Sequence, residues 1–275
     1  MSESSRSWLA VDVGNSRVKF VLFNEPLYRA SLELPEALAA WTVALGQPIP
    51  WQDLHLTVKR LTNGVHAVIA GSNQKAVDRI VEAWPETLSH RPCLVRSSEG
   101  FPLEILVDEP RRVGLDRVLS AVAAAVITAK RRPAIIVDCG TATTVNLMRA
   151  DGAFLGGAIL PGFALMSQAL HHYTEVLPLV SIEEIVSIDG EYRGHAPLGK
   201  NTKQAIMSGI FWGQLGAVRE LVQRLSQEVE GSPDVLLSGG GSRLLVPHLT
   251  TATHYPYLAL QGLVLVAAAG RATCV

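Results

Sequence analysis

Cysteine is scarce in this chain of 275 residues, which has three, Cys93, Cys139 and Cys274, and no Cys-x-x-Cys pair. Scattered cysteines in an odd number predict neither a disulfide framework nor a zinc site. We therefore expect the protein to work in a reducing compartment, with the cytoplasm as its location.

The chain also lacks an excess of charge of either sign. Its 24 lysines and arginines nearly balance 25 aspartates and glutamates, which gives a net charge of −1. Nucleic-acid-binding domains usually carry a strongly basic surface, so we expect no nucleic-acid partner.

Long hydrophobic runs are missing as well. The most apolar stretches, residues 118–129 and 262–270, are shorter than the roughly 20 residues that span a bilayer. Residues 1–7 are polar and do not resemble a signal peptide. We expect no membrane partner.

The remaining composition, 48% hydrophobic and 18% charged residues, is that of an ordinary globular protein, and the length allows two domains. Strand-like runs alternate with helix-like stretches, which favours an α/β fold with a mixed sheet in each domain. The expected strands are residues 9–11, 18–23, 67–70, 93–95, 135–137, 144–148, 153–155 and 235–237. The expected helices are residues 34–45, 74–84, 116–130, 163–173, 202–229 and 262–272.

One pattern occurs twice. An apolar run ends in Asp12, followed by one residue and Gly14, and another ends in Asp138, followed by one residue and Gly140. A second apolar run follows each copy, so each predicts a strand, a tight turn and a returning strand. Backbone N–H groups in such a turn suit a phosphate, and a nearby carboxylate suits its cation. The two copies predict a duplicated domain with two phosphate-binding hairpins facing a nucleotide cleft.

The expected domains are residues 1–113 and 114–275, because a Pro-Arg-Arg-Val-Gly stretch before residue 115 interrupts both periodicities. The last helix of the chain is expected to pack back on the first domain. Three acidic side chains, Asp12, Asp116 and Asp138, are expected to meet at the nucleotide.

Three further segments carry candidate functional residues. Gly114-Leu115-Asp116-Arg117 begins a helix, where Asp116 is either a catalytic carboxylate or a partner of the helix N-terminus. Ser238-Gly239-Gly240-Gly241-Ser242 follows a strand and is expected to contact adenosine. It lacks the third glycine of the dinucleotide fingerprint, because Leu244 stands there, which excludes a Rossmann dehydrogenase. Asn201 is expected to cap the helix that follows it.

Together these motifs resemble the type III pantothenate kinase family of the acetate and sugar kinase/Hsc70/actin superfamily. The match runs through Asp12 to Lys19, Gly114 to Arg117 and Asp138 to Thr143. It continues through residues 156–162, Asn201-Thr202 and Ser238 to Gly240.

The resemblance implies two actin-like (ribonuclease H-like) duplicated domains and ATP-dependent phosphorylation of pantothenate, the first step of coenzyme A biosynthesis. It implies ATP, Mg²⁺ and a monovalent cation, K⁺ or NH₄⁺, as cofactors, and a homodimer whose interface helps form the pantothenate site. The residues expected to bind ATP are Asp12, Val13, Gly14, Asn15, Ser16, Arg17, Val18, Lys19 and Thr141.

Asp138 is expected to bind the monovalent cation and Asp116 to be the general base. The residues expected to contact pantothenate are Gly114, Leu115, Asp116, Arg117, Thr202 and Val107. Two positions depart from the family pattern: Ser16 replaces the usual Thr and keeps its hydroxyl, and Val107 stands where a substrate-contacting Tyr is common.

Two alternatives stay open. The chain could be another small-molecule kinase or a phosphatase of the same superfamily, or a catalytically silent nucleotide-binding regulatory module. The presence of Asp12, Asp116 and Asp138 together argues against the silent module.

Overall fold

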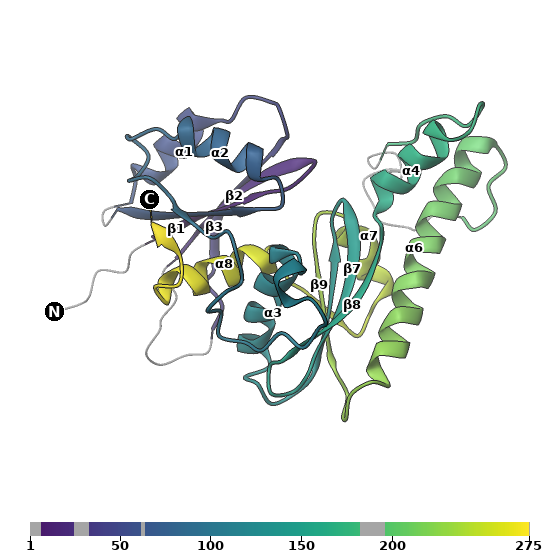
Figure 1. Cartoon of the computed structure of the whole chain (residues 1–275). Coiled ribbons are helices and arrows are strands. Elements are labelled where there is room, and N and C mark those ends of the chain that lie inside the picture. The colour runs from purple at the N-terminus through teal and green to yellow at the C-terminus, as the bar shows by residue number, and fades with distance from the viewer. Residues whose placement is uncertain (1–6, 25–32, 62–63, 182–195, 275) are drawn as a thin grey trace. The chain divides into compact units, whose positions relative to one another are not determined.

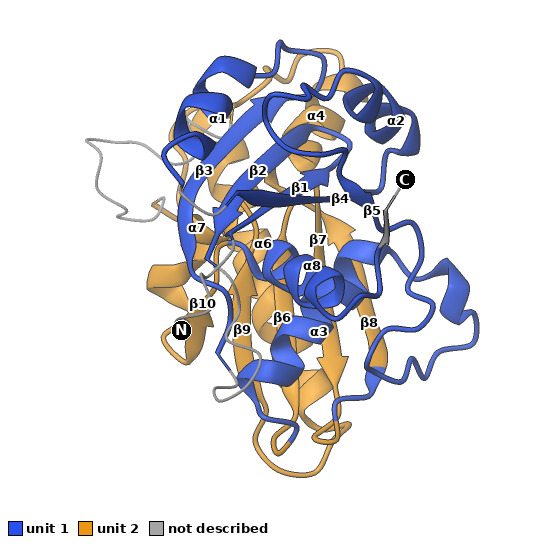
Figure 2. Ribbon diagram, turned by 90° about the vertical axis from the view of Figure 1, so that its left-hand side faces the viewer, with its two compact units in different colours: residues 1–130, 152–154, 257–275 blue, residues 131–151, 155–256 orange. Residues whose placement is uncertain are grey.

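A β-sheet forms the centre of each of the two units in this computed structural model (Figure 1). The structure describes residues 7–24, 33–61, 64–181 and 196–274. Unit 1 comprises residues 1–130, 152–154 and 257–275, and unit 2 comprises residues 131–151 and 155–256 (Figure 2).

The division between the units differs from the one we expected at residues 113 and 114. Helix α3 (Leu115–Ile127) belongs to unit 1, and it packs against α8 (Leu258–Ala268) of the same unit. A Cβ on Gly262 of α8 would lie 1.9 Å from the backbone oxygen of Leu119, so the close crossing requires glycine. The stretch before α3, which contains the short helix η1 (Pro110–Arg112), is therefore a connection inside unit 1.

In the described part of unit 1, the sheet has the strand order β11-β5-β4-β1-β2-β3. The sheet is mixed, because β1 runs antiparallel to β2 and parallel to β4. The bounds are β1 (Ser7–Val13), β2 (Arg17–Phe23), β3 (Ala37–Ala44), β4 (Val65–Gly71), β5 (Cys93–Leu94) and β11 (Thr273–Cys274).

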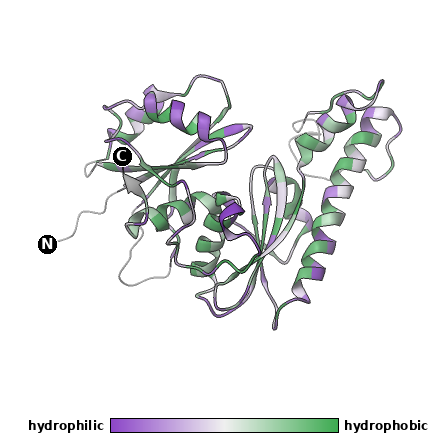
Figure 3. Ribbon diagram, viewed as in Figure 1, coloured by the Kyte–Doolittle hydropathy of each residue, from purple (hydrophilic) through white to green (hydrophobic). Residues whose placement is uncertain are grey.

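The sheet of unit 1 has a hydrophobic core on each face, because side chains alternate along its strands. On β1, Leu9 and Val11 belong to the core shared with α1 (Trp51–Val58) and α2 (Gln74–Glu82). Ala10 belongs to the other core, with residues of α3 and α8. Helix α8, which lies on β1 and β4, is hydrophobic along nearly its whole length (Figure 3).

The described part of unit 2 has the strand order β10-β9-β6-β7-β8. Here β6 runs antiparallel to β7 and parallel to β9. The strands are β6 (Ala134–Cys139), β7 (Ala142–Met148), β8 (Phe154–Pro161), β9 (Asp234–Ser238) and β10 (Ala252–His254). The helices are α4 (Phe163–His172), α6 (Thr202–Ser226), α7 (Ser242–Leu245) and η2 (Val246–His248).

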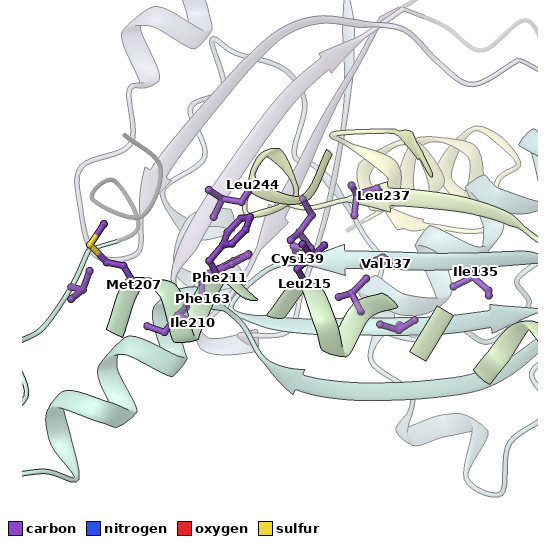
Figure 4. Packing of buried hydrophobic residues seen from close by; sticks show 14 of the residues in the cluster. Ile135, Val137, Cys139, Phe163, Met207, Ile210, Phe211, Leu215, Leu237 and Leu244 are labelled. Carbon is purple, nitrogen blue, oxygen red and sulfur yellow. The ribbon is translucent and has the colours of Figure 1, made fainter. Parts of the chain in front are cut away.

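One large core holds unit 2 together. Phe163 and Phe211 are almost fully buried and pack with Leu244 and with strand residues such as Val137 (Figure 4). Helix α6 supplies much of this core and contacts both β6 and β7. The long helix α6 thus packs against the hairpin β6–β7.

Five strands of each sheet follow the same order. The series β5-β4-β1-β2-β3 in unit 1 corresponds to β10-β9-β6-β7-β8 in unit 2, and the antiparallel hairpin occupies the same place in both. This agrees with the duplicated mixed sheets that the sequence predicts.

The prediction of a helix at residues 34–45 is wrong, because residues 37–44 of this range form strand β3. Its register pairs Phe20 of β2 with Trp41, and Ala39 and Trp41 pack against the unit 1 core. The Ala- and Leu-rich composition favours a helix locally, but sheet pairing overrides that preference. Helix α1 and strands β10 and β11 were not predicted.

One prediction from the cysteine spacing is wrong. Cys93 is disulfide-bonded, so the expectation of no disulfide is wrong for this residue, while Cys139 is free and buried. Sequence spacing did not reveal that the last strand, β11, pairs with β5. Within the described ranges, no helix is both long and apolar enough to cross a bilayer.

Candidate active site

The first predicted phosphate hairpin is the connection between β1 and β2. Asp12 lies opposite Lys19 in the antiparallel register, so both side chains leave the same face of the sheet. The turn is closed by a hydrogen bond from the Gly14 N–H to the Arg17 carbonyl at 3.0 Å. Asn15 and Arg17 are exposed, which leaves the turn accessible to a ligand.

Asp12 lies in the field of two other charged groups. Burial raises the pKa of its carboxyl, Lys19 opposes that change, and Asp116 adds to it. Two of the three acidic residues singled out in the sequence therefore influence each other within unit 1. The third, Asp138, belongs to unit 2.

The Gly114–Arg117 segment forms the first turn of α3. The Asp116 carboxylate accepts a hydrogen bond from the Arg117 N–H at 2.9 Å, as an acidic residue at a helix N-terminus does. A Cβ on Gly114 would lie 2.7 Å from that carboxylate oxygen, so a larger residue there would require the Asp116 side chain to shift. Asp116 is nevertheless exposed, so the carboxylate is accessible from solvent.

Arg117 is half-buried over an aromatic ring. Its guanidinium carbon lies 5.5 Å from the centroid of the Phe154 ring, within cation–π range. Burial lowers the pKa of Arg117, and the negative charge of Asp116 opposes that change. Val107 follows a segment that hydrogen-bonds to the backbone of Phe154, and it also lies in unit 1.

The second phosphate hairpin joins β6 to β7 in unit 2. Asp138 lies opposite Thr144, and the Gly140 N–H donates to the Ala142 carbonyl at 3.0 Å. Three residues, 140–142, separate the last paired positions here, against four, 14–17, in the first hairpin. Thr141 is exposed, and its carbonyl accepts a hydrogen bond from the Gly162 N–H at 3.0 Å.

Asp138 also influences its neighbour Cys139. Burial, and after it the charge of Asp138, raises the pKa of the Cys139 thiol to about 12, although a hydrogen bond with Thr143 opposes the change. The thiol is therefore protonated at neutral pH and does not serve as a nucleophile or metal ligand.

The glycine-rich loop lies directly against Asp138. Strands β6 and β9 pair Asp138 with Ser238, and the next residue, Gly239, has a φ of +88°. A Cβ on Gly239 would lie 2.3 Å from the Asp138 carboxylate oxygen, so glycine is required. The Gly241 N–H donates to the Cys139 carbonyl at 2.9 Å, which fixes the loop to the end of β6.

Side chains from two elements fix the other end of this loop. The buried Ser242 hydroxyl donates to the Gly239 carbonyl at 2.5 Å and lies 2.9 Å from Nε2 of His254 on β10. Because the hydroxyl hydrogen is used by Gly239, the hydrogen between Ser242 and His254 must come from His254. His254 was not predicted from the sequence, because a spacing of 12 residues from Ser242 gives no local signal.

The surroundings of Asp138 fit a hard cation better than a transition metal. In the described ranges no three His, Cys, Asp or Glu side chains gather as a metal-binding group. Asp138 offers a carboxylate oxygen beside Gly239 at the end of β6, and the carbonyl oxygen of Ala142 lies next to Gly140 in the adjoining turn. Oxygen ligands of this kind suit hard cations.

Thr202 is the first residue of α6, and Asn201 caps this helix as predicted. The Asn201 side chain accepts a hydrogen bond from the Gln204 N–H at 2.9 Å. Thr202 lines a cavity of about 590 Å³ whose other walls are mostly apolar residues of α4 and α6, such as Leu165 and Ile210. Thr202 belongs to unit 2, whereas Val107 and Gly114–Arg117 belong to unit 1.

Comparison with known proteins gives consistent matches along the chain. A family model described as type III pantothenate kinase matches residues 8–224. The type III pantothenate kinase of Gluconobacter oxydans is 29% identical over 271 residues, covering 94% of this chain and 92% of the relative. That of Paramagnetospirillum magneticum is 33% identical over 254 residues, covering 89% and 88%.

Solved structures are similar in fold at low sequence identity. A conserved putative Baf family transcriptional activator from Campylobacter jejuni has a TM-score of 0.55 at 17% identity, covering 95% of this chain and 98% of its own. The activator of 2-hydroxyisocaproyl-CoA dehydratase from Clostridium difficile, with bound ADPNP, has a TM-score of 0.54 at 13% identity, covering 97% and 95%. The expected actin-like fold is confirmed.

Proposed function

Because the chain belongs to the type III pantothenate kinase family, we propose that it moves the γ-phosphoryl group of ATP in line to the primary hydroxyl of pantothenate, with Asp116 as general base. The enzyme is a kinase of coenzyme A biosynthesis that uses ATP and pantothenate. The product would be 4′-phosphopantothenate, and the step the first of that pathway.

ATP binding is assigned to the two hairpins, through Asp12 to Lys19 and Thr141. The accessible turn after Gly14 and the exposed Thr141 support this assignment. Phosphoryl transfer proceeds mostly through a loose transition state, so positioning and charge neutralisation should dominate catalysis. Lys19 supplies a positive charge on the face of the sheet that carries Asp12.

Asp116 is assigned the role of accepting the proton of the pantothenate hydroxyl. A carboxylate is too weak a base to remove an alcohol proton in advance, so Asp116 would orient the hydroxyl and accept its proton as the new bond forms. The exposure of Asp116 at the start of α3 supports this role, and so does its influence on Asp12 of the first hairpin.

Pantothenate binding is assigned to Gly114 to Arg117, Val107 and Thr202. Pantothenate carries a carboxylate, and Arg117 is a permanent cation next to the proposed base. Mg²⁺ and a monovalent cation, K⁺ or NH₄⁺, would supply charge neutralisation for the phosphates, with Asp138 holding the monovalent ion. The Asp138 carboxylate and the Ala142 carbonyl oxygen, both near Gly140, support that assignment.

We also propose that the enzyme is a homodimer in the cytoplasm. Several large apolar side chains on α4 and α6 are exposed, among them Leu165, Leu170 and Trp212. Exposed apolar groups gathered around a cavity are typical of an interaction surface, and a second copy of this chain is the proposed partner.

The function is tested by measuring ADP release from the purified protein with pantothenate, with and without K⁺. ADP release that requires both pantothenate and K⁺ is the expected result. Release with another acceptor, such as acetate or a sugar, would favour a different kinase of the superfamily. No turnover with any acceptor despite ATP binding would favour the regulatory module, and both outcomes would overturn the proposal.

Asp116→Asn tests the mechanism. General-base groups contribute about 10²- to 10⁴-fold, so kcat should fall by about that range while binding of ATP stays nearly unchanged. Turnover near that of the wild type would remove Asp116 from its role. The matched control is Asp53→Asn, an exposed acidic residue of α1 in unit 1 that is not part of the proposed site.

A further inference from the structure

Phe154, the first residue of β8, is fully buried and contacts two segments that carry proposed pantothenate contacts. Its N–H donates to the Glu104 carbonyl, and its carbonyl accepts from the Leu106 N–H, both at 2.8 Å. The peptide groups of Phe154 therefore fix the segment directly before Val107.

The ring of Phe154 contacts the second segment through Arg117. The guanidinium carbon lies 5.5 Å from the ring centroid, and an aromatic face attracts a cation at this distance. Arg117 is half-buried, and loss of water around a guanidinium strengthens its attraction to an aromatic ring. Asp116 precedes Arg117 and faces it with an opposite charge.

These contacts restrict Arg117 to few orientations. A long arginine side chain loses rotamer entropy when it is held in one geometry. If the ring of Phe154 already holds the guanidinium in place, the entropy of the Arg117 side chain is lost on folding. It is then not lost again when the substrate carboxylate binds. Phe154 itself is immobilised by its burial and by two backbone hydrogen bonds.

We propose that Phe154 is a positioning residue that holds Arg117 ready for the carboxylate of the substrate, and thereby sets the preference for an acidic acceptor. The inference rests on the proposed function, because it assumes that Arg117 contacts pantothenate. Phe154 acts through Arg117 and does not itself touch the reacting atoms.

Phe154→Met tests the proposal by replacing the ring with a flexible apolar chain. The KM for pantothenate should rise about 3- to 30-fold, as expected for the loss of one desolvated cation–π contact, with the KM for ATP unchanged. Phe154→Tyr keeps an aromatic face and should restore the KM for pantothenate. Phe101→Met is the matched control, because Phe101 is buried in the same unit and lies outside the proposed site.

A double-mutant cycle shows whether Phe154 acts through Arg117. In an Arg117→Gln background, Phe154→Met should have no further effect on the binding of labelled pantothenate, because neighbours that act as a unit are not additive. Independent effects that multiply, or equal effects of Phe101→Met and Phe154→Met, would overturn the proposal.

An NMR measurement separates this inference from the proposed function. Phe154→Met should remove the ring-current shift of the Arg117 side-chain signals, whether or not the protein phosphorylates pantothenate. If the shift is present in the wild type and ADP release fails, the proposed function is wrong and the contact is real. If the wild type shows no ring-current shift at Arg117, the positioning role is wrong.

Discussion

At the scale of single residues, Asp12 combines a functional assignment with an unfavourable environment. Its carboxyl is partly buried, and burial together with Asp116 raises its pKa despite the opposite charge of Lys19. An ionised carboxyl in this environment lowers the free energy of unfolding, because in the unfolded chain the same charge is fully hydrated. Binding sites often retain such destabilising charged groups, because the charge is needed to bind the ligand although it does not stabilise the fold.

Asp12→Asn should therefore raise the free energy of unfolding and lower the enzymatic activity. The folded pKa of Asp12 lies above its unfolded value, so its favourable contribution is complete at low pH and is lost as the pH rises through the folded pKa. The gain in the free energy of unfolding on Asp12→Asn should be larger at pH 7 than at pH 4, as measured by urea unfolding. Activity should fall by about 10²-fold, as for loss of a fixed charge at a phosphate site.

Glu104→Gln is the control for that prediction, because Glu104 is an exposed acidic residue of unit 1 outside the sheet. It should change the unfolding free energy little at either pH. A loss of stability at pH 7 on Asp12→Asn would mean that the attraction of Lys19 outweighs burial.

At the scale of elements, the packing of α3 against α8 depends on one glycine. The backbone oxygen of Leu119 occupies the place that a Cβ on Gly262 would take. Gly262→Ala should lower the free energy of unfolding by about 1–3 kcal/mol, because overpacking forces the helices apart. Thermal and urea unfolding measure the change.

Gly216→Ala provides the matched comparison. Gly216 lies in α6, and a Cβ there would meet nothing within 4 Å. Its replacement should raise stability by about 0.5–1 kcal/mol, since alanine is the better helix former. Equal effects of the two substitutions would show that helix propensity, not the crossing, decides at Gly262.

The sequence predicted those elements whose patterns are local. The two hairpins and the cap of α6 by Asn201 follow from neighbouring residues, and the structure contains them. Strand β3 was missed because its identity depends on pairing with β2, which Ala-rich composition does not reveal. The duplication offered a clue, because β3 occupies the position of β8 in the other sheet.

The candidate site was predicted in a similarly uneven way. Asp12 was singled out by the repeated Asp-x-Gly pattern and Asp116 by the resemblance of Gly114 to Arg117 to the family motif, whereas the residues that support them were not predicted. Phe154 reaches Arg117 from a distant part of the chain, and His254 reaches Ser242 across two elements. Such support depends on tertiary contacts and carries no sequence motif.

At the scale of the whole molecule, the proposed homodimer can be tested directly by measuring the mass of the protein in solution. Light scattering should give twice the chain mass of 29.6 kDa. Gly209→Glu should yield the single-chain mass, because Gly209 lines the α4–α6 cavity, is exposed and has open space for a side chain. A buried unpaired charge at an apolar interface is strongly unfavourable.

Gln223→Glu adds the same charge to α6 away from the cavity and should leave the mass unchanged. A single-chain mass for the wild type would contradict the homodimer. A Gly209→Glu protein that keeps the doubled mass would place the contact elsewhere.

The difference in turn length between the two hairpins has a further consequence. Residues 14–17 and 140–142 are not interchangeable parts, although they join equivalent strands. Grafting the longer loop onto β6 and β7 would change the geometry of the turn, and a one-residue slip of the pairing in response would turn every side chain of β7 to the opposite face. Each half of this chain therefore closes its hairpin with a turn of its own length.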